Sequence, residues 1–397
     1  MADQALTGIK ILDLSQDIAG PYSTKLFADY GAEVIKVEPP EGDPARRVGP
    51  FPHDEPHAER SGLFLHLNTN KLGITLNLKT ATGVKLLKEL VKDANVLVES
   101  FPPGTMADAG LSYEAMEEIN PRLVMISITP FGQTGPYKDF VFTESTAWAM
   151  GSRMSITGQG GRPPHPLAGN ASQYLAGTQA ALATMGAVMG SALHGIGQHV
   201  DVSIQETLLA AVDSRLLFFS YTKEVSNRGD TAPAGFHFAS DGFIQFPVAA
   251  VQTRSWNRLV RLLEMPELLE DPRFATPADR GQHRDDLEAI ILPWLLERTK
   301  YEIARAAQAL GVFAAPVLDV GEVVNDEHFA ARGFFVEVDH PATGTLKYPG
   351  APFKMKETPW QVRRPAPLLG QHNAEIYSDR LGFSREDLVR LREEGII

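Results

Sequence analysis

The segment between residues 135 and 172 concentrates side chains that could bind a substrate or react with it. It holds the carboxylate of Glu144, and its glycine- and proline-rich run TGQGGRPPHP carries Arg162 and His165. Long irregular segments in compact domains are often functional, so we expect residues 151–172 to form either an active-site loop or an exposed surface loop. A guanidinium such as that of Arg162 can pair with a substrate carboxylate. Three nearby aromatic residues could line a substrate pocket or pack in the core: Phe142, Trp148 and Tyr174.

Several other kinds of chemistry lack the residues that they need. The chain has no cysteine, which removes disulfides, thiolate metal ligands and a cysteine nucleophile. Its 11 histidines are scattered and no pair has the spacing of a metal site, so we expect no bound metal. After the first apolar run the chain reads SQDIAGP rather than GxGxxG, so we expect neither NAD nor flavin.

An alternation of strands and helices precedes this segment and must position it. An apolar strand at 9–14 leads through a loop to a helix at 23–30 and a second strand at 33–38. Further elements are predicted at 73–78 (strand), 82–92 (helix), 95–99 (strand) and 123–129 (strand). Repeated strand–helix–strand units predict a doubly wound α/β fold with a parallel sheet.

The pattern of apolar and polar residues changes near Thr222, and strand-like runs return near Gly333. Residues 236–247 are typical of a hairpin turning at Asp241-Gly242, and amphipathic helices are predicted at 253–263 and 285–296. We interpret this middle region as a smaller α+β domain. A charged helix is predicted at 384–394, near the end of the chain.

The composition is that of an ordinary globular protein. Of the 397 residues 43% are apolar, and the net charge of -12 argues against nucleic acid or an anionic membrane as partner. No signal peptide or membrane span is visible, so we expect a cytoplasmic location. Residues 174–193 are predicted to form a tightly packed internal helix, and we expect the core to include Met154, Met185 and Met189.

Five segments, in order along nearly the whole chain, carry a resemblance to a known family. They are ILDLSQDIAGPYSTKLFADYGAEVIKVE, NTNKLGITLNLKT, NPRLVMISITPFGQTGPY, GQHVDVSIQE and APLLGQHNAEI. The sequence resembles the class III CoA-transferases, the formyl-CoA and carnitine-CoA transferase family that also includes the 2-methylacyl-CoA racemases. The resemblance implies a Rossmann-like large domain built from both chain ends (1–221 and 333–397), a small inserted domain with its linkers (222–332), and an interlocked dimer.

The resemblance also implies covalent chemistry on coenzyme A. A family aspartate attacks an acyl-CoA to form a mixed anhydride, an enzyme–CoA thioester follows, and an incoming carboxylate collects the CoA. In this chain Asn170 stands at the position of that aspartate, and an amide is a poor nucleophile. The residues that the resemblance assigns to binding coenzyme A or acyl-CoA are Ile18, Ala19, Leu76, Asn77, Lys79, Ser100 and Phe101.

Other positions depart from the family pattern where it places cations or polar groups. Pro39 and Asp108 stand where formyl-CoA transferases have CoA-contacting arginines, and Val141 and Thr143 fall near a family lysine and tyrosine. Losing these cations removes charge-assisted contacts to the CoA phosphates. Lys79 matches a family CoA-contacting lysine.

Several interpretations of the function remain open. The favoured one is a non-catalytic subunit that pairs with a homologous catalytic chain, as in the succinyl-CoA:benzylsuccinate CoA-transferases of anaerobic aromatic degradation. The alternatives are an active homodimer in which Glu144 replaces the aspartate or Asn170 is an engineered change, and an acyl-CoA racemase. A racemase needs an acid–base pair, for which Glu144 and His165 are poor candidates. We expect His372 to anchor the C-terminal segment.

Overall fold

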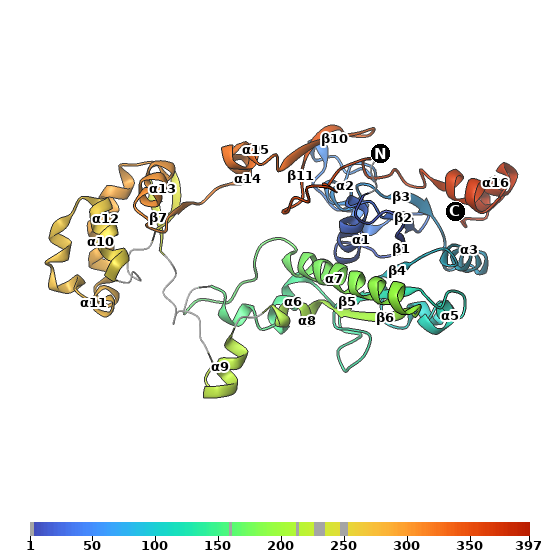
Figure 1. Cartoon of the computed structure of the whole chain (residues 1–397), viewed down its shortest axis with the longest axis horizontal. Coiled ribbons are helices and arrows are strands. Elements are labelled where there is room, and N and C mark those ends of the chain that lie inside the picture. The colour runs from blue at the N-terminus through green and yellow to red at the C-terminus, as the bar shows by residue number, and fades with distance from the viewer. Residues whose placement is uncertain (1–3, 159–160, 212–213, 226–234, 247–252) are drawn as a thin grey trace. The chain divides into compact units, whose positions relative to one another are not determined.

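The computed structural model describes the 397-residue chain except residues 1–3, 159–160, 212–213, 226–234 and 247–252 (Figure 1). The chain divides into two compact units, each described by itself. The first comprises Met1–Thr157, Pro164–Val225 and Gly333–Ile397, and the second comprises Gly158–Pro163 and Ser226–Arg332. The domain division at residues 222 and 333 remains our proposal.

The first unit contains a parallel sheet of six strands in the order β3-β2-β1-β4-β5-β6. Its strands are β1 (Lys10–Asp13), β2 (Glu33–Glu38), β3 (Leu72–Thr75), β4 (Val96–Glu99), β5 (Val124–Thr129) and β6 (Gln198–Ser203). All six residues of β5 are buried, as expected for a strand covered on both faces. This order and these crossovers are those of a Rossmann-like α/β fold, as predicted.

Helices pack on both faces of the sheet, and alternate residues of β1 point to opposite sides. Ile11 joins a core with α1 (Ala19–Asp29) and α7 (Ala171–His194), whereas Leu12 joins a core with α3 (Ala81–Val91) and α16 (Arg385–Glu393). The other helices of this unit are α2 (Gly62–Leu67), α4 (Thr105–Asp108), α5 (Tyr113–Glu117), α6 (Glu144–Met150), α8 (Ile204–Ala210) and α9 (Arg215–Thr222).

Helix α7 approaches α1 very closely because its contact face consists of small residues. A Cβ atom on Gly177 would lie 2.5 Å from the carbonyl oxygen of Ala19. The opposite face of α7 is exposed, and Met189 keeps 57% of its surface accessible. The expectation of a wholly internal helix with Met189 in the core was therefore wrong, because alanine and glycine pack only one side of this helix.

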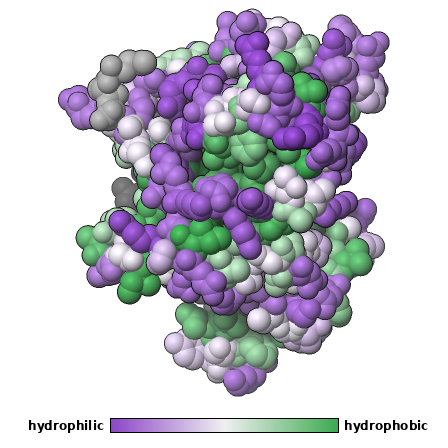
Figure 2. Space-filling model, turned by 90° about the vertical axis from the view of Figure 1, so that its right-hand side faces the viewer, coloured by the Kyte–Doolittle hydropathy of each residue, from purple (hydrophilic) through white to green (hydrophobic). Residues whose placement is uncertain are grey.

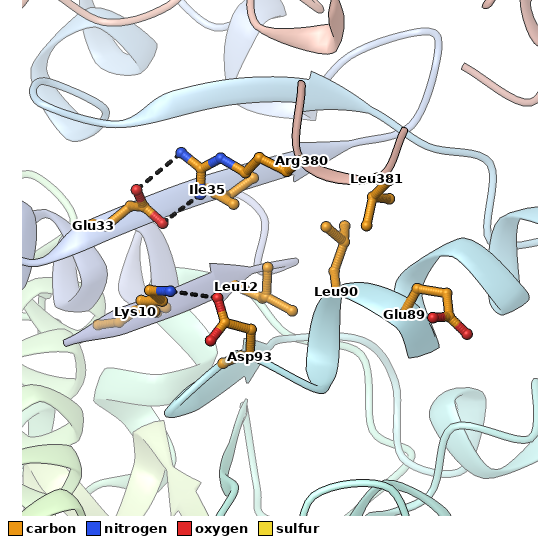
Figure 3. Close-up of a pocket in the computed structure, with 11 residues that line it drawn as sticks. Lys10, Leu12, Glu33, Ile35, Glu89, Leu90, Asp93, Arg380 and Leu381 are labelled. Atoms are coloured by element: carbon orange, nitrogen blue, oxygen red, sulfur yellow. Dashed lines mark hydrogen bonds and ion pairs between the residues drawn. The ribbon is translucent and has the colours of Figure 1, made fainter. Parts of the chain in front are cut away.

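The C-terminal segment returns to the first unit and is fastened to the sheet. It forms the hairpin β10 (Phe335–His340) and β11 (Gly344–Pro349), then a π-helix at Ala374–Arg380. The amide of His372 donates to the Gly73 carbonyl and its Nδ1 accepts from the Gly73 amide at 2.9 Å, which confirms the anchoring role. Arg380 pairs with Glu33 at the edge of a hollow of about 130 Å³ (Figure 3).

The second unit is α+β, as predicted. Strands β7 (Phe236–Ala239), β8 (Gly242–Gln245) and β9 (Ala315–Pro316) form an antiparallel sheet. Ala239 pairs with Gly242, so the hairpin turns at Ser240–Asp241, one residue before the predicted position. The helices are α10 (Thr253–Leu263), α11 (Pro277–Gln282), α12 (Arg284–Leu296), α13 (Lys300–Ala309), α14 (Val320–Asn325) and α15 (Glu327–Ala331). Among the described residues, no helix is long and apolar enough to cross a membrane.

Candidate active site

A cleft of about 550 Å³ lies where the chain leaves the carboxyl ends of β1, β2, β3 and β4. The strand order reverses between β1 and β4, and ligands of open α/β sheets bind at this topological switch point. Figure 2 views the side where α3, α5 and α16 lie, and shows apolar patches bordered by hydrophilic residues. The cleft lining is similarly mixed: Leu14, Gln16, Val37, Pro39, Glu41, Leu76, Asn77, Leu78, Lys79, Phe101, Thr105, Met106, Asp108, Ala109 and Leu111.

Four of the residues assigned to CoA binding line this cleft, namely Leu76, Asn77, Lys79 and Phe101. Ser100 lies beside it, because its Oγ accepts a hydrogen bond from the backbone amide of Gln16 at 2.8 Å. Ile18 and Ala19 do not line the cleft; they are buried at the start of α1.

Gln16, which the sequence analysis missed, lines the cleft from the loop after β1. Its only signal in the sequence was its place in the loop just after the predicted strand at 9–14.

The last residues of the chain hold the Asn77–Lys79 wall of the cleft. The Asn77 amide donates to the Ile396 carbonyl at 2.7 Å, and its Nδ2 donates to the Gly395 carbonyl at 3.0 Å. The Asn77 Oδ1 atom accepts from the Lys79 amide at 3.0 Å. The wall is therefore built from residues more than 300 positions apart, which the local sequence pattern cannot show.

A buried ion pair supports the loop that follows β1. Lys71 Nζ lies 2.9 Å from Asp13 Oδ2, and both side chains are fully buried. The Thr24 hydroxyl donates to Asp13 at 2.6 Å, the Ser15 hydroxyl donates to it as well, and the Ser15 amide donates at 3.1 Å. Burial alone would raise the pKa of Asp13, but Lys71, Lys36 and these hydrogen bonds lower it to about 2. Burial lowers the pKa of Lys71 to about 8 against the attraction of Asp13.

The charges around the cleft are mostly negative. Asp108 and Glu41 line it together with Pro39, and Lys79 is the only cation among its described lining residues. A ligand with several phosphate charges would therefore meet one ammonium group and two carboxylates.

Asn170 caps α7 and lies outside the lining of the cleft. It is half-buried, and its side chain makes no capping hydrogen bond to the helix. Glu144 reaches the same helix start, because its Oε1 accepts from the Ser172 amide at 2.7 Å and its Oε2 accepts from the Ser172 hydroxyl at 2.6 Å. Oε1 also accepts from Trp148 Nε1 at 2.8 Å. Both oxygens of Glu144 are thus engaged in holding α6 and α7 together.

The other candidates have varied positions. Phe142 and Trp148 pack in core clusters, and Tyr174 meets the ring of Tyr22 edge-on at 4.9 Å. His165 is exposed and its Nδ1 lies 3.2 Å from the Pro166 carbonyl. Further residues are exposed as well: Val141, Thr143 and Arg162, the last within the second unit. Over the described ranges, no group of three His, Asp or Glu side chains could hold a metal ion.

Comparisons with known proteins agree with this architecture. The family model for CoA-transferase family III matches residues 6–373. The chain is 36% identical to the succinyl-CoA–D-citramalate CoA-transferase of Chloroflexus aurantiacus, over 99% of this chain and 98% of that protein.

Two further relatives and a solved structure extend the match. The beta and alpha subunits of the succinyl-CoA–L-malate CoA-transferase of the same organism are 30% and 31% identical over 99% of this chain, covering 98% and 92% of those subunits. The crystal structure of a CAIB/BAIF family protein from Brucella suis superposes with a TM-score of 0.85 and 29% identity, over 95% of this chain and 99% of that one. The chain therefore belongs to CoA-transferase family III, and it is a CoA-transferase.

Proposed function

We propose that this chain is the non-catalytic subunit of an assembly that moves CoA from an acyl-CoA, such as succinyl-CoA, to a carboxylic acid. The amide of Asn170 at the start of α7 carries this proposal. A carboxylate there would form the mixed anhydride, whereas an amide oxygen is a poor nucleophile.

The cleft supports the same conclusion. It has the place and size for an acyl-CoA ligand, and four of the expected residues line it. Pro39 supplies no charge and Asp108 supplies a negative one, so the CoA phosphates have too few cations. We expect the chain to bind CoA weakly by itself, without a metal, NAD or flavin.

The expected partner is a homologous catalytic chain, interlocked with this one in the cytoplasm. Relatives with alpha and beta subunits exist in the L-malate enzyme. Helix α9 exposes large apolar side chains around its circumference, with none of its eight residues buried in the single chain. So much exposed apolar surface needs a covering surface, and a second chain of the same fold would provide it. A benzylsuccinate-type acceptor is one candidate substrate.

An active homodimer is the second candidate, favoured by the 36% identity to an enzyme whose name carries no subunit designation. Asn170 would then be an engineered change, or Glu144 would stand in for the aspartate. The hydrogen bonds that occupy both Glu144 oxygens count against the latter role. A racemase is less well supported, because His165 is exposed and bonded to its own neighbour's carbonyl.

The purified chain alone should show no CoA transfer from succinyl-CoA to a carboxylate acceptor, because it lacks the nucleophile. Transfer should appear when a homologous chain with the aspartate is co-expressed and co-purified. A thioester-transfer assay on both preparations tests this. Robust turnover by the isolated chain would contradict the non-catalytic role. Loss of that turnover in Glu144→Gln, with an unchanged unfolding temperature, would then assign it to Glu144.

A further inference from the structure

A buried carboxylate stands directly behind one wall of the cleft. Glu99, the last residue of β4, is 2% exposed. Its Oε2 accepts a hydrogen bond from the Phe101 backbone amide at 2.7 Å, and Phe101 lines the cleft. This carboxylate therefore holds the backbone at the point where the chain turns from β4 into the cleft wall.

A series of hydrogen-bonded side chains leads from Glu99 to solvent. The Ser127 hydroxyl of β5 bonds to the Glu99 carboxylate, and Ser127 Oγ lies 2.8 Å from Nε2 of His199 on β6. His199 is solvent-exposed, with the Tyr113 ring of α5 stacked on it at 5.7 Å. These residues line a cavity of about 130 Å³, which shares Met106 with the cleft.

We propose that Glu99 is a positioning residue for the cleft: when ionised, it fixes the backbone at Phe101 and raises the affinity of the cleft for CoA. The inference rests on the proposed function, in which the cleft holds CoA. A hydrogen bond to an ionised carboxylate is roughly twice as strong as one to a neutral carboxyl group, so ionisation tightens the wall.

The hydrogen bonds through Ser127 and His199 provide a path by which one proton moves between solvent and Glu99. When Glu99 is ionised, Ser127 donates to it and accepts from Nε2–H of His199. On protonation, His199 takes a proton from solvent at Nδ1 and passes its Nε2 proton to Ser127, which passes its own to Glu99. Glu99 then donates to Ser127, and Ser127 donates to Nε2, so one proton has moved from solvent to Glu99.

The surroundings of Glu99 place its titration near neutral pH. Burial, with a smaller contribution from Asp201 on β6, raises the pKa of Glu99 to about 7 against the hydrogen bonds from Ser127 and Phe101. Burial lowers the pKa of His199, opposed by Asp201 and by Glu114 of α5. The remaining titratable group that faces the cavity is Tyr113, whose pKa burial raises.

The first test needs no ligand. The full chain is labelled with ¹⁵N-phenylalanine, and the Phe101 amide signal among the 20 phenylalanines is assigned by its loss in Phe101→Leu. We expect this signal to titrate with a midpoint about one unit or less from pH 7 in the wild type and to stay constant in Glu99→Gln. The matched control, Glu114→Gln, removes an exposed acid of the same cavity and should leave the titration intact. A flat Phe101 signal in the wild type would overturn the proposal.

The second test titrates CoA into the same proteins at pH 6 and pH 8. We expect the affinity for CoA to be roughly three- to tenfold higher at pH 8 than at pH 6 in the wild type and in Glu114→Gln. This factor corresponds to the difference in strength between a charge-assisted and a neutral hydrogen bond. A CoA phosphate also titrates near pH 6, but it does so equally with every variant. A smaller ratio of the CoA affinities at pH 8 and pH 6 in Glu99→Gln therefore reports the contribution of Glu99. An unchanged ratio in Glu99→Gln would refute the proposal. Absence of CoA binding at both pH values would refute the CoA role of the cleft as well, and the Phe101 titration distinguishes the two failures.

Discussion

At the scale of single residues, we expect the buried Asp13–Lys71 ion pair to contribute strongly to the stability of the fold around the site. Asp13→Asn leaves the buried Lys71 ammonium without its counter-charge, so we expect a loss of about 3–5 kcal/mol in the free energy of unfolding, measured by urea denaturation. The control is Asp93→Asn, which breaks the exposed pair with Lys10 and should cost under about 1 kcal/mol. Equal losses in both variants would contradict the role of the buried pair.

The same pair gives a pH dependence with a fixed sign. The pKa of Asp13 is lowered to about 2 in the folded protein from an ordinary value of 3.8. Its contribution to stability is therefore fully present above pH 3.8 and is lost as the pH falls from there through 2. We expect the difference in stability between wild type and Asp13→Asn to shrink over that window, as measured by thermal unfolding. A difference that stays constant would show that Asp13 is not held ionised by its partners.

At the scale of elements, the contact of α7 with α1 positions the start of α7. Gly177→Ala would place a methyl group 2.5 Å from the Ala19 carbonyl oxygen and push the helices apart, so we expect a loss of about 1–3 kcal/mol. The matched control is Gly186→Ala in the same helix, where nothing lies within 4 Å of the new Cβ. It should gain about 0.5–1 kcal/mol from helix propensity. Opposite or equal effects, measured by chemical denaturation, would contradict the close approach.

The elements themselves were largely predictable, and the contacts of the site were not. Strand β2 was expected at 33–38 and lies there, because its apolar run is buried on both faces. Gln16 and Asp13 could not be singled out from the local sequence, because their partners Ser100 and Lys71 lie far along the chain. Glu99 bonds to the nearby Phe101 amide, but its burial follows from the packing of the whole sheet and has no local signal. Asp13 carried one signal, a charge inside an apolar strand. The exposed face of α7 could not be foreseen, because the alanine-rich sequence does not distinguish a helix packed on two sides from one packed on a single side.

At the scale of the whole molecule, the exposed apolar side chains of α9 predict a stable assembly. Leu216, Leu217, Phe218, Phe219 and Tyr221 are 42–84% exposed in the single chain. Leu217→Glu should weaken association with the partner chain, because a charge in a buried apolar interface is costly. Light scattering of the co-purified assembly checks this, with Val389→Glu on α16 as the control at a single exposed apolar residue. A wild-type protein that stays monomeric in every preparation would contradict the interlocked assembly.

The central claim, that this chain is the non-catalytic partner, is tested most directly by restoring the carboxylate. Asn170→Asp is assayed for thioester transfer and for CoA binding by calorimetry, beside Gln173→Asp, which places a carboxylate in the first turn of the same helix. We predict weak CoA binding and no transfer by either variant alone, because Pro39 and Asp108 still deprive the CoA phosphates of cations. Tight CoA binding with turnover of about 1 per second or faster in either variant would contradict the account and show that the chain is a catalytic homodimer.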